Sequence, residues 1–405
     1  MKPEFCFFED PYLENFHPLT LTRPLDDLRI GILTLGEKWV RSLGLDENSA
    51  GSLLRAHLKG VFKEPDVKTS DSTVIWINPR FLPTKSLTES VLNLSRNQGI
   101  FHDSQLVACN ISRDLHLKWS RSGMENGDID QKILEKHDGL ILKNSWELFQ
   151  YNGSQIESDL RLMGLRPVSD AGEYPHALLV HPEKIYIEEG ATIEPGALLY
   201  AESGSVYIGK GAQIMANSVV RGPSAVCDHS VVKMGAKIYE ETTIGPVCKV
   251  GGEIANVIFH SYSNKSHDGY TGNSVFGQWC NLGADTNTSN LKNNYGTVKV
   301  YDWKRKKMYD SGQQFVGTIM GDHSKTGINS MLNTGTVCGV CCNLFSDAYP
   351  PKFIPSFSWV SGSDTVPYHF EKAIEAMERM MGRRKVVLTP AYKRMMRAIY
   401  RSTNF

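Results

Sequence analysis

One polar segment, Ser261–Asn290, carries the residues best suited to chemistry. It reads SYSNKSHDGYTGNSVFGQWCNLGADTNTSN and places His267 three residues before Tyr270. An imidazole titrates near neutral pH, so a histidine exposed in a cleft can take a proton from an attacking amine. The polar neighbours of His267 favour exposure. A surface or interface histidine without a catalytic role is the alternative.

The sequence that must position this segment is a six-residue repeat. Eight aliphatic residues recur at intervals of six, and a small residue follows each of the first seven by four places. Repeats of this kind predict a parallel β-helix, in which each coil buries its inner face against its neighbours. The aliphatic residue points inward and the small residue fits a corner. The aliphatic residues are Ile208, Ile214, Val220, Val226, Val232, Ile238, Ile244 and Val250; the small ones are Ala212, Ser218, Ser224, Ser230, Ala236, Thr242 and Cys248.

The repeat continues in both directions, with interruptions. Upstream, Ile187, Ile193 and Leu199 keep the spacing, and three extra residues separate them from Ile208. Between Val250 and Phe276 the count loses phase, so the repeat does not predict which way His267 points. The polar stretch from about 287 to 314 cannot form coils and predicts a long loop, which is usually functional. The repeat resumes with Phe276, Leu282, Met320, Thr326, Leu332, Cys338 and Leu344.

Outside the repeat, the chain predicts two further regions. Residues 1–175 are expected to form an α/β domain with a connecting helix and a linker from 170 to 175. The β-helix is expected over 181–365 and a basic helical tail over 366–405. Predicted strands are Phe5–Phe8, Val74–Ile77 and Leu106–Ala108; predicted helices are Ser52–Phe62, Ser86–Leu94, a segment within Ser145–Met163 with its N-cap at Ser145, Tyr368–Met381 and a final helix that begins at Thr389-Pro390.

The overall charge is balanced, with 44 Lys plus Arg and 44 Asp plus Glu residues. This balance does not indicate binding to nucleic acid or to a membrane surface. No stretch approaches the roughly 20 apolar residues of a membrane span, and the first ten residues do not read as a signal peptide. We therefore expect a cytoplasmic protein.

The cysteines and the loop histidines do not predict a metal site. Cys338 and Cys341 have zinc-knuckle spacing, but no second pair has it. Cys338 falls on the inward aliphatic position, and Cys248 and Cys342 fall on the small position, which favours a packing role. The histidines at 260, 267 and 323 lack the compact spacing of a metal-binding pair.

The tail concentrates positive charge. From residue 383 onward it carries seven basic residues and no acidic one: Arg383, Arg384, Lys385, Lys393, Arg394, Arg397 and Arg401. These residues could hold a polyphosphate ligand such as coenzyme A. A solvated basic face that caps the end of the β-helix is the alternative.

Two long stretches, Pro18–Trp39 and Cys248–Gly283, and the motifs YSNKSHDGYTG and MGDHSKTGINSMLNTGTV carry a family resemblance. The chain resembles the GlmU family of bifunctional N-acetylglucosamine-1-phosphate uridylyltransferases and glucosamine-1-phosphate acetyltransferases, and in particular its divergent sugar nucleotidyl transferase branch. The resemblance implies a nucleotidyltransferase-like α/β domain and a left-handed parallel β-helix with a helical tail, assembled as a homotrimer. It implies acetyl-CoA-dependent N-acetylation of an amino sugar phosphate or a nucleotide sugar, in UDP-N-acetylglucosamine biosynthesis.

The resemblance also implies roles for individual residues of the repeat region. His267 matches the general base of the family, and Tyr270, Asn281 and Asn290 match substrate-contacting residues. Ala284 matches a position whose backbone amide meets the acyl group of the coenzyme. Lys237 replaces an arginine that binds the sugar phosphate. Two departures concern binding: a phosphate-binding lysine of the family falls on Ala255, and a coenzyme-contacting serine falls on Ile328.

The N-terminal region matches its family less fully. Thr22, Arg23 and Arg29 are retained as candidate nucleotide-binding residues, but the glycine run that cradles a triphosphate is lost. Mg²⁺ would be required if this domain transfers a nucleotide, yet no aspartate near Leu106–Ala108 matches a metal-binding motif. The alternative role of Arg23 is a salt bridge to Asp26 or Asp27 that fixes the loop.

Two other functions remain open at this stage. The chain could be a sugar-1-phosphate nucleotidyltransferase whose β-helix serves only for assembly. It could also be a non-catalytic scaffold that binds a nucleotide sugar. The losses at Ala255 and in the glycine loop favour these alternatives, whereas the grouping of His267, Tyr270, Asn281 and Asn290 favours acetyl transfer.

Overall fold

The structure is a computed structural model that describes residues 3–46, 49–65, 73–122, 128–134, 138–169, 171–362 and 364–403. Contacts divide the chain into two compact units. The first unit contains residues up to Leu13, Arg23–Leu28 and Leu33–Lys143; the second contains Glu14–Thr22, Arg29–Ile32 and the chain from Asn144 onward. Two short N-terminal segments and the connecting helices, which we assigned to the first domain, therefore belong to the same unit as the β-helix.

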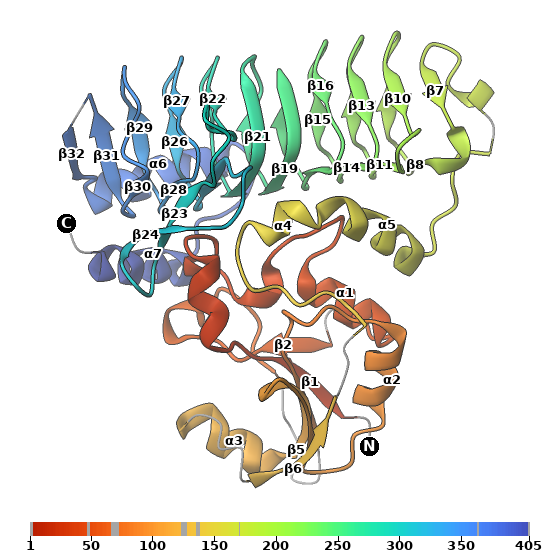
Figure 1. Cartoon of the computed structure of the whole chain (residues 1–405), viewed down its shortest axis with the longest axis vertical. Helices are drawn as coiled ribbons and strands as arrows, with labels where there is room; N and C mark the ends of the chain where they lie inside the picture. Colours follow the sequence, from red (N-terminus) through yellow and green to blue (C-terminus); the bar gives the residue numbers. More distant parts are fainter. Residues whose placement is uncertain are drawn as a thin grey trace. The chain divides into compact units, whose positions relative to one another are not determined.

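The first unit is built on a six-stranded mixed sheet with strand order β2-β1-β3-β5-β4-β6 (Figure 1). β5 runs antiparallel to β3 and β4, and the other pairs are parallel. All three predicted strands are present. The strands are β1 Glu4–Phe7, β2 Ala50–Ser52, β3 Thr73–Ile77, β4 Gln98–His102, β5 Gln105–Ser112 and β6 Asp130–Ile133.

Hydrophobic residues cover both faces of this sheet because side chains alternate along each strand. Phe5 and Phe7 pack with Trp39 on one face, whereas Cys6 and Phe8 pack on the other face. The helices are α1 Leu35–Ser42, α2 Lys85–Leu92 and α3 Arg113–Ser122, with short 3-10 helices at Pro11–Phe16, Leu19–Leu21, Leu25–Asp27 and Ala56–Leu58. α2 confirms the helix predicted at Ser86–Leu94.

Two predictions for helices are wrong. The predicted helix Ser52–Phe62 is replaced by the end of β2 and a 3-10 turn, because Ala50–Ser52 pairs with β1 and sheet formation overrides the local helical preference. Ser145 is not an N-cap. α4 begins at Glu147, whose carboxylate instead accepts hydrogen bonds from the backbone and side-chain nitrogens of Asn144.

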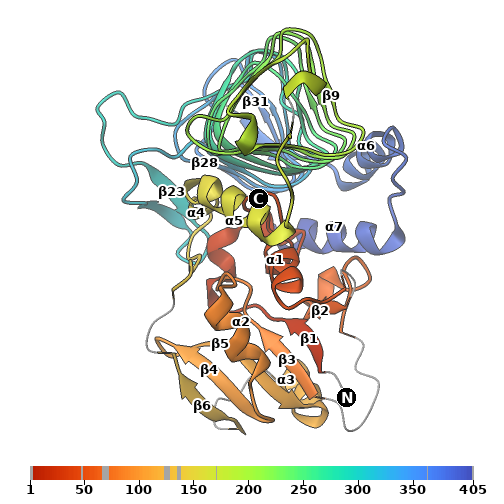
Figure 2. The ribbon, with the colours of Figure 1, turned by 90° about the vertical axis from the view of Figure 1, so that its right-hand side faces the viewer.

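The second unit is dominated by a left-handed parallel β-helix, seen along its axis in Figure 2. Each coil contributes a strand to each of three faces. The first face contains β7 Leu178–Val180, β10 Leu198–Tyr200, β13 Val219–Arg221, β16 Lys237–Ile238, the starts of β19 Glu253–Ser261 and β21 Tyr270–Gln278, β22 Asn287–Thr288 and β27 Met331–Leu332. The second face contains β8 Ile185–Ile187, β11 Val206–Ile208, β14 Ser224–Val226, β17 Thr242–Ile244, the ends of β19 and β21, β25 Thr318–Met320, β28 Thr336–Cys338 and β30 Phe353–Ile354. The third face contains β9 Thr192–Ile193, β12 Gln213–Ile214, β15 Val231–Val232, β18 Lys249–Val250, β20 Asn264–Lys265, β26 Lys325–Thr326, β29 Asn343–Phe345 and β31 Ser358–Ser361.

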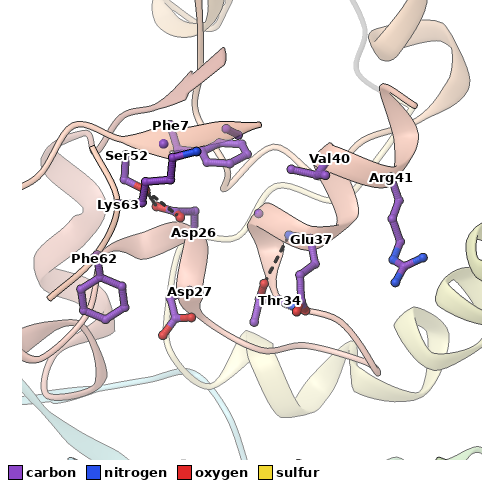
Figure 3. Close-up of a pocket in the computed structure, with 13 residues that line it drawn as sticks. Phe7, Asp26, Asp27, Thr34, Glu37, Val40, Arg41, Ser52, Phe62 and Lys63 are labelled. Atoms are coloured by element: carbon purple, nitrogen blue, oxygen red, sulfur yellow. Dashed lines mark hydrogen bonds between the residues drawn. The ribbon is translucent and has the colours of Figure 1, made fainter. Parts of the chain in front are cut away.

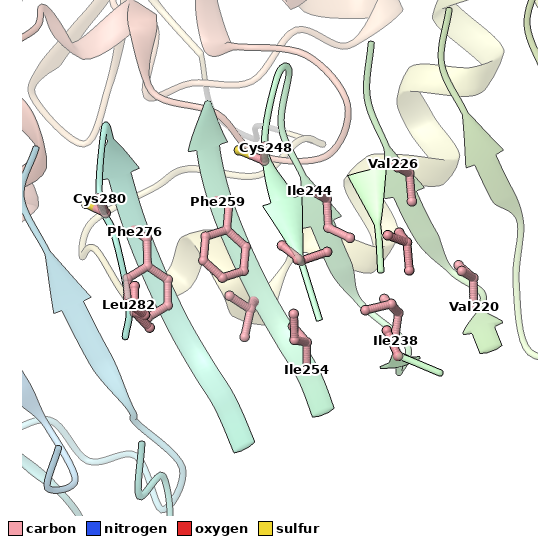
Figure 4. Close-up of a cluster of buried hydrophobic side chains, with 14 of the residues drawn as sticks. Val220, Val226, Ile238, Ile244, Cys248, Ile254, Phe259, Phe276, Cys280 and Leu282 are labelled. Atoms are coloured by element: carbon pink, nitrogen blue, oxygen red, sulfur yellow. The ribbon is translucent and has the colours of Figure 1, made fainter. Parts of the chain in front are cut away.

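The repeat positions pack as predicted. All eight aliphatic residues and all seven small residues have at most 1% of their surface exposed. The aliphatic side chains form a continuous column inside the coils (Figure 4). Burying each of them contributes about 1.5–3 kcal/mol. Cys338, Cys248 and Cys342 occupy the packing positions predicted for them.

The loss of phase after Val250 has a simple geometric cause. Stacked corner residues Ser230 and Cys248 are 18 positions apart, but Cys248 and Ser263, which stack next, are only 15 apart. Ser263 and Cys280 are 17 apart. One coil is therefore shorter than its neighbours, and it immediately precedes His267.

The remaining elements flank the β-helix. The predicted loop after Asn287 starts with β22 and then leaves the coil to form an antiparallel hairpin of β23 Lys299–Asp302 and β24 Lys307–Asp310. The tail helices confirm the prediction, and Thr389 caps the second one by accepting a hydrogen bond from Tyr392 N. The other elements are α4 Glu147–Gln150, α5 Asn152–Met163, 3-10 helices at Ala171–Glu173 and Pro182–Lys184, β32 Asp364–Pro367, α6 Phe370–Gly382 and α7 Pro390–Ser402.

Among the described residues, no helix has the length and apolar character needed to cross a membrane. The cytoplasmic location stays a prediction.

Candidate functional site

His267 lies at the corner that joins the third face of the β-helix to the first. β20 ends at Lys265 on the third face, and β21 starts at Tyr270 on the first face. The His267 side chain is exposed, as its polar neighbours predicted. Within the described part of the chain, no hydrogen-bond partner is found for its imidazole. The imidazole can therefore contact a ligand bound on the first face or on the third face of the β-helix.

On the first face, two of the predicted residues share one row. Lys237 pairs with Glu253 in the strand ladder, and Glu253 pairs with Tyr270. Neighbouring strands lie about 4.8 Å apart, so the backbones of Lys237 and Tyr270 are about 10 Å apart. The Lys237 side chain is 62% exposed, and its ammonium group lies 3.7 Å from the Glu253 carboxylate. It can turn toward an anion at little cost, because such exposed pairs are weak.

Tyr270 and Asn290 contact each other beside Lys237. Asn290 Nδ2 donates hydrogen bonds to Tyr270 Oη at 3.2 Å and to Asn273 Oδ1 at 2.6 Å. The two side chains lie over Gly272, where an added Cβ would come within 2.4 Å of Tyr270 Oη. Gly272 pairs with Ala255, the position of the lost family lysine. Burial raises the pKa of the Tyr270 hydroxyl, which therefore stays protonated at neutral pH.

A groove of about 560 Å³ opens at the corner between the first and second faces, and Asn273 connects it to the Tyr270–Asn290 pair. The returning end of the long loop forms one side, and α4 contributes Gln150, whose Nε2 donates to Gln313 Oε1 at 2.7 Å. Burial, followed by the charge of Glu240, raises the pKa of Glu241. The lining residues include two acidic residues and no basic one: Phe149, Gln150, Tyr239, Glu240, Glu241, Ala255, Asn256, Asn273, Gln313, Gln314 and Phe315.

The other predicted residues lie across the His267 corner. Asn281 forms a bridge between Asn264 and Lys325 on the third face. Ala284 belongs to the next corner, which stacks directly on the His267 corner, because Asp285 N donates to Asp268 O at 3.1 Å. No acceptor for the Ala284 N–H is found among the described residues, so this amide can donate to a ligand.

A cluster of basic residues, which we call the basic cluster, lies on the third face near Asn281. It consists of Lys233, Lys249, Arg383 and Arg384. Arg384 Nη2 donates to Asn264 Oδ1 at 3.0 Å, and Lys249 pairs with Asn264 in the strand ladder. Burial lowers the pKa of Lys249, and the charges of Arg384, Lys233 and Arg383 lower it further. Lys393 and Arg397 of the same tail instead pair with acidic residues of α6 at 3.5 and 2.9 Å.

The predicted residues therefore form two groups on either side of one histidine. Lys237, Tyr270 and Asn290 lie on the first face, and Asn281 and Ala284 lie toward the third face. Sequence reasoning missed Asn273, which completes the Tyr270 group, and it missed the basic cluster as a unit. It also missed that Lys265 is buried, which a count of six could not reveal because the preceding coil is short.

The first unit has its own pocket, with a volume of about 350 Å³ (Figure 3). Its walls include the ends of β1 and β2 and the start of α1. Asp26 lies in this pocket and accepts a hydrogen bond from Ser52 Oγ at 2.9 Å. Burial raises the pKa of Asp26 to about 7, and the charges of Asp27 and Glu9 add to the effect. Lys63 and Arg41 also line the pocket.

The carboxyl ends of β1 and β3, where ligands of open α/β sheets usually bind, carry a closed polar network. Arg80 is fully buried and pairs with Asp10. Asn78 Nδ2 donates to Asp10 Oδ2 at 2.7 Å, and Arg80 Nη2 donates to Gln105 Oε1 at 2.8 Å. The Arg80 guanidinium also lies 4.3 Å from the centre of the Tyr12 ring. The polar groups at this edge of the sheet therefore satisfy one another.

The three candidate nucleotide-binding residues are buried with protein partners. Arg23 pairs with Asp27 at 3.0 Å, which confirms the alternative salt bridge. Thr22 Oγ1 donates to Asp322 Oδ2 at 2.8 Å within the second unit. Arg29, also in the second unit, donates to the backbone carbonyls of His260 and Ile32. Their role toward a nucleotide stays a prediction.

Few side chains of the described residues are grouped so that they could bind Mg²⁺. Among the described residues, no group of three or more His, Cys, Asp or Glu side chains could hold a metal. Mg²⁺ is often held by one or two carboxylates together with the phosphates of its substrate. Asp26 and Asp27 are the aspartates of the first-unit pocket.

Solved structures with a similar fold are distant. The polySia-specific acetyltransferase NeuO is 13% identical, with a TM-score of 0.25, over 45% of this chain and 86% of that one. The UDP-N-acetylglucosamine acyltransferase from Campylobacter jejuni is 12% identical, with a TM-score of 0.23, over 57% of this chain and 96% of that one.

Sequence relatives share a single name, bifunctional protein GlmU. The relative from Synechococcus elongatus is 26% identical over 254 residues, which are 58% of this chain and 48% of the relative. The relative from Prochlorococcus marinus is 31% identical over 184 residues, 42% of this chain and 33% of the relative. The chain spans about half or less of the length of the curated relatives it matches. Residues 5–166 match the family model described as sugar nucleotidyl transferase, and over this stretch the chain is similar to that family.

Proposed function

We propose that this protein is a transferase whose β-helix acetylates the amino group of an amino sugar phosphate or a nucleotide sugar, with acetyl-CoA as the donor. The observation that carries the proposal is the position of His267. Its exposed imidazole stands at the corner between the first face, which carries the Tyr270–Asn290 pair, and the third face, which carries the basic cluster. An acceptor amine and an acyl thioester could thus approach the same histidine from two sides.

The donor would bind along the third face. The basic cluster is suited to the phosphates of coenzyme A, since four neighbouring cations repel one another until an anion binds. The N–H of Ala284 would donate to the carbonyl oxygen of the thioester. A backbone donor aimed at that oxygen stabilises the negative charge that develops during attack, typically by about 3 kcal/mol.

The acceptor would bind along the first face, between the His267 corner and the groove beside Asn273. The Glu241 carboxylate favours a ligand that carries an amine, whereas the Glu240 carboxylate already pairs with Arg221 at 2.7 Å. Tyr270 and Asn290 offer hydrogen bonds to sugar hydroxyls. Lys237, which lies in the same row as Tyr270, could pair with the phosphate of the acceptor. The family's second phosphate-binding lysine is replaced by Ala255, which supports an acceptor whose phosphate is held differently from that of glucosamine-1-phosphate.

The reaction would proceed by direct transfer. The amine nitrogen attacks the thioester carbonyl carbon, a C–N bond forms, and His267 takes the proton that the nitrogen releases. The C–S bond then breaks, and the imidazolium returns the proton to the thiolate of coenzyme A. A well-placed base of this kind contributes about 10²–10⁴-fold to the rate.

A thiol-release assay with acetyl-CoA and glucosamine-1-phosphate, extended to other amino sugar phosphates and nucleotide sugars, tests the proposal. His267→Ala should lower kcat by about 10²–10⁴-fold. His229→Ala is the matched control, because His229 is also an exposed corner histidine but lies in an earlier coil. Robust release that His267→Ala leaves unchanged would remove this residue as the base.

For the first unit we propose binding of a nucleotide sugar in the pocket beside Asp26, with nucleotide transfer as the second candidate. The satisfied Asp10–Arg80 network and the absent glycine run favour binding over turnover. Calorimetry with UDP-N-acetylglucosamine measures the binding. Pyrophosphate release from UTP and a sugar phosphate with Mg²⁺ would instead establish uridylyl transfer, and Thr22, Arg23 and Arg29 would then be tested as contributors.

A homotrimer is also proposed. Large apolar side chains are exposed on the β-helix at Met234 (68%), Ile328 (73%) and Phe345 (46%). Ile328 and Phe345 are neighbours, since a Cβ on Gly327 would come within 2.9 Å of the Phe345 ring, and neighbouring exposed apolar residues commonly mark protein interfaces. Light scattering of the full chain at micromolar concentration should give three times the mass of 45.3 kDa.

A further inference from the structure

A lysine occupies an interior position of the β-helix. Lys265 pairs with Val250 in the third-face ladder, and the column before it holds the inward residues Ile193, Ile214 and Val232. Its surface is fully buried. A charged residue in such a column is expensive unless its charge is hydrogen-bonded, so the partners of its ammonium group require an explanation.

The ammonium group has three hydrogens and three acceptors, all of them backbone carbonyls. Nζ donates to His267 O at 2.8 Å, to Asp268 O at 2.9 Å and to Gly251 O at 3.4 Å. Two of these carbonyls belong to the corner that carries the candidate base. Burial lowers the pKa of Lys265 to about 8, while the carboxylates of Asp268 and Asp285 oppose the shift.

A mismatch between two stacked corners explains why a lysine stands here. β18 ends at Val250 and β19 starts at Glu253, so only Gly251 and Gly252 form this corner. The next corner, from Ser266 to Gly269, is longer and lies close over it. A Cβ on Gly252 would come within 2.7 Å of Gly269 O. The Lys265 ammonium group bridges the two corners by donating to a carbonyl of each.

We propose that Lys265 is a positioning residue, whose ammonium group holds the backbone of the Ser266–Gly269 corner so that the His267 imidazole faces the acceptor and the thioester. The inference deepens the proposed acetyl transfer and rests on it for the catalytic role of His267. It adds a residue that neither faces the groove nor touches a ligand.

Removing the ammonium group would loosen the corner without removing the base. Lys265→Met keeps an unbranched side chain of similar length and leaves the carbonyls of His267 and Asp268 without this donor. A displacement of about 1 Å at a reacting group can cost about 10²-fold in rate. We expect kcat to fall about 10- to 100-fold, with the KM for acetyl-CoA changed less than about 3-fold.

Ile208→Val is the matched control. Ile208 is an inward residue of an earlier coil, and its truncation lowers stability modestly without affecting the His267 corner. Its kcat should equal that of the wild type. A Lys265→Met protein that folds and keeps the wild-type kcat would overturn the inference.

A second readout does not depend on activity. The rate at which diethyl pyrocarbonate modifies His267, followed by peptide mapping, reports the exposure and environment of the ring. Lys265→Met should change this rate at least about 3-fold, while the rate at His229 stays constant; equal rates at His267 would contradict the proposal. If the wild type transfers no acetyl group, the proposed function fails, but this rate still decides whether Lys265 positions the ring.

If Lys265→Met does not fold, the wild type itself provides the test. Amide hydrogen exchange should show the N–H groups of Glu253 and Asp285, which donate to Gly269 O and Asp268 O, protected to the same degree as the N–H of His229, which donates to Lys210 O. Exchange of the Glu253 and Asp285 amides at the rate of a free loop would overturn the inference, because a corner whose carbonyls the Lys265 ammonium group holds in place keeps both of these hydrogen bonds.

Discussion

Asn290 Nδ2 donates a hydrogen bond to Tyr270 Oη at 3.2 Å, although the two residues are 20 positions apart in the chain. Tyr270 starts the strand after the His267 corner, and Asn290 stands where the long loop leaves the β-helix. The backbone of Asn290 closes the base of that loop by accepting a hydrogen bond from Val316 N at 3.0 Å. Asn290 therefore hydrogen-bonds both to Tyr270 and Asn273 on the β-helix and to the returning end of the long loop.

Asn290→Ala should weaken acceptor binding. It removes the hydrogen bonds to Tyr270 and Asn273, and each neutral hydrogen bond is worth about 1 kcal/mol. We expect the KM for the acceptor to rise about 10-fold and the KM for acetyl-CoA to stay constant. Initial-rate kinetics with both substrates varied measure the two constants, and Asn293→Ala, in the exposed part of the same loop, serves as control.

The basic cluster should govern binding of the coenzyme. Lys249→Ala and Arg384→Ala should each raise the KM for acetyl-CoA about 10-fold, since a hydrogen bond to a charged group contributes about 1.5–3 kcal/mol. The KM for the acceptor should not change. If the double variant transfers acetyl groups with an unchanged KM for acetyl-CoA, the third face is not the coenzyme site. That result would favour the alternative in which the basic tail is a solvated face that caps the β-helix.

Asp26 should make the stability of the first unit depend on pH. Its folded pKa is raised to about 7 from an ordinary value of 3.8, so the folded state binds more protons between these pH values. The contribution of Asp26 to stability is thus fully present below about pH 4 and is lost as the pH rises through 7. Asp26→Asn should raise the unfolding temperature relative to the wild type at pH 8 but not at pH 4.

Calorimetric unfolding at the two pH values measures this difference. Asp46→Asn, at an exposed aspartate of the same unit, is the control and should show no pH-dependent gain. A gain of equal size at both pH values would show that Asp26 is ionised throughout this range in the folded protein.

Arg80 should be essential to the first unit. Its guanidinium is fully buried beside Asp10, and removal of one partner leaves an uncompensated buried charge. Arg80→Met should lower the free energy of unfolding by about 3–5 kcal/mol. Chemical denaturation followed by tryptophan fluorescence measures the loss, and Arg80→Met combined with Asp10→Asn should recover part of it.

The hexapeptide spacing by itself determined the β-helix and the direction of its inward residues. Each of the eight aliphatic repeat residues, from Ile208 to Val250, lies where a coil has room only for an aliphatic side chain. Each of the seven small repeat residues, from Ala212 to Cys248, lies at a crowded corner. Such positions are readable because the constraint is local and repeats with every strand. The same holds for the cap at Thr389, whose partner is only three residues away.

Only the tertiary structure decided how His267 is presented. The coil before it is three residues short, so counting by six could not place His267, and no local signal marks Lys265 as an interior residue. Ser52–Phe62 was misread as a helix for a related reason, since β2 exists only through its pairing with β1. Backbone groups that remain unpaired after the coils and strands stack must find partners elsewhere in the unit. Which groups remain unpaired depends on the whole unit, so a short stretch of sequence does not reveal these contacts.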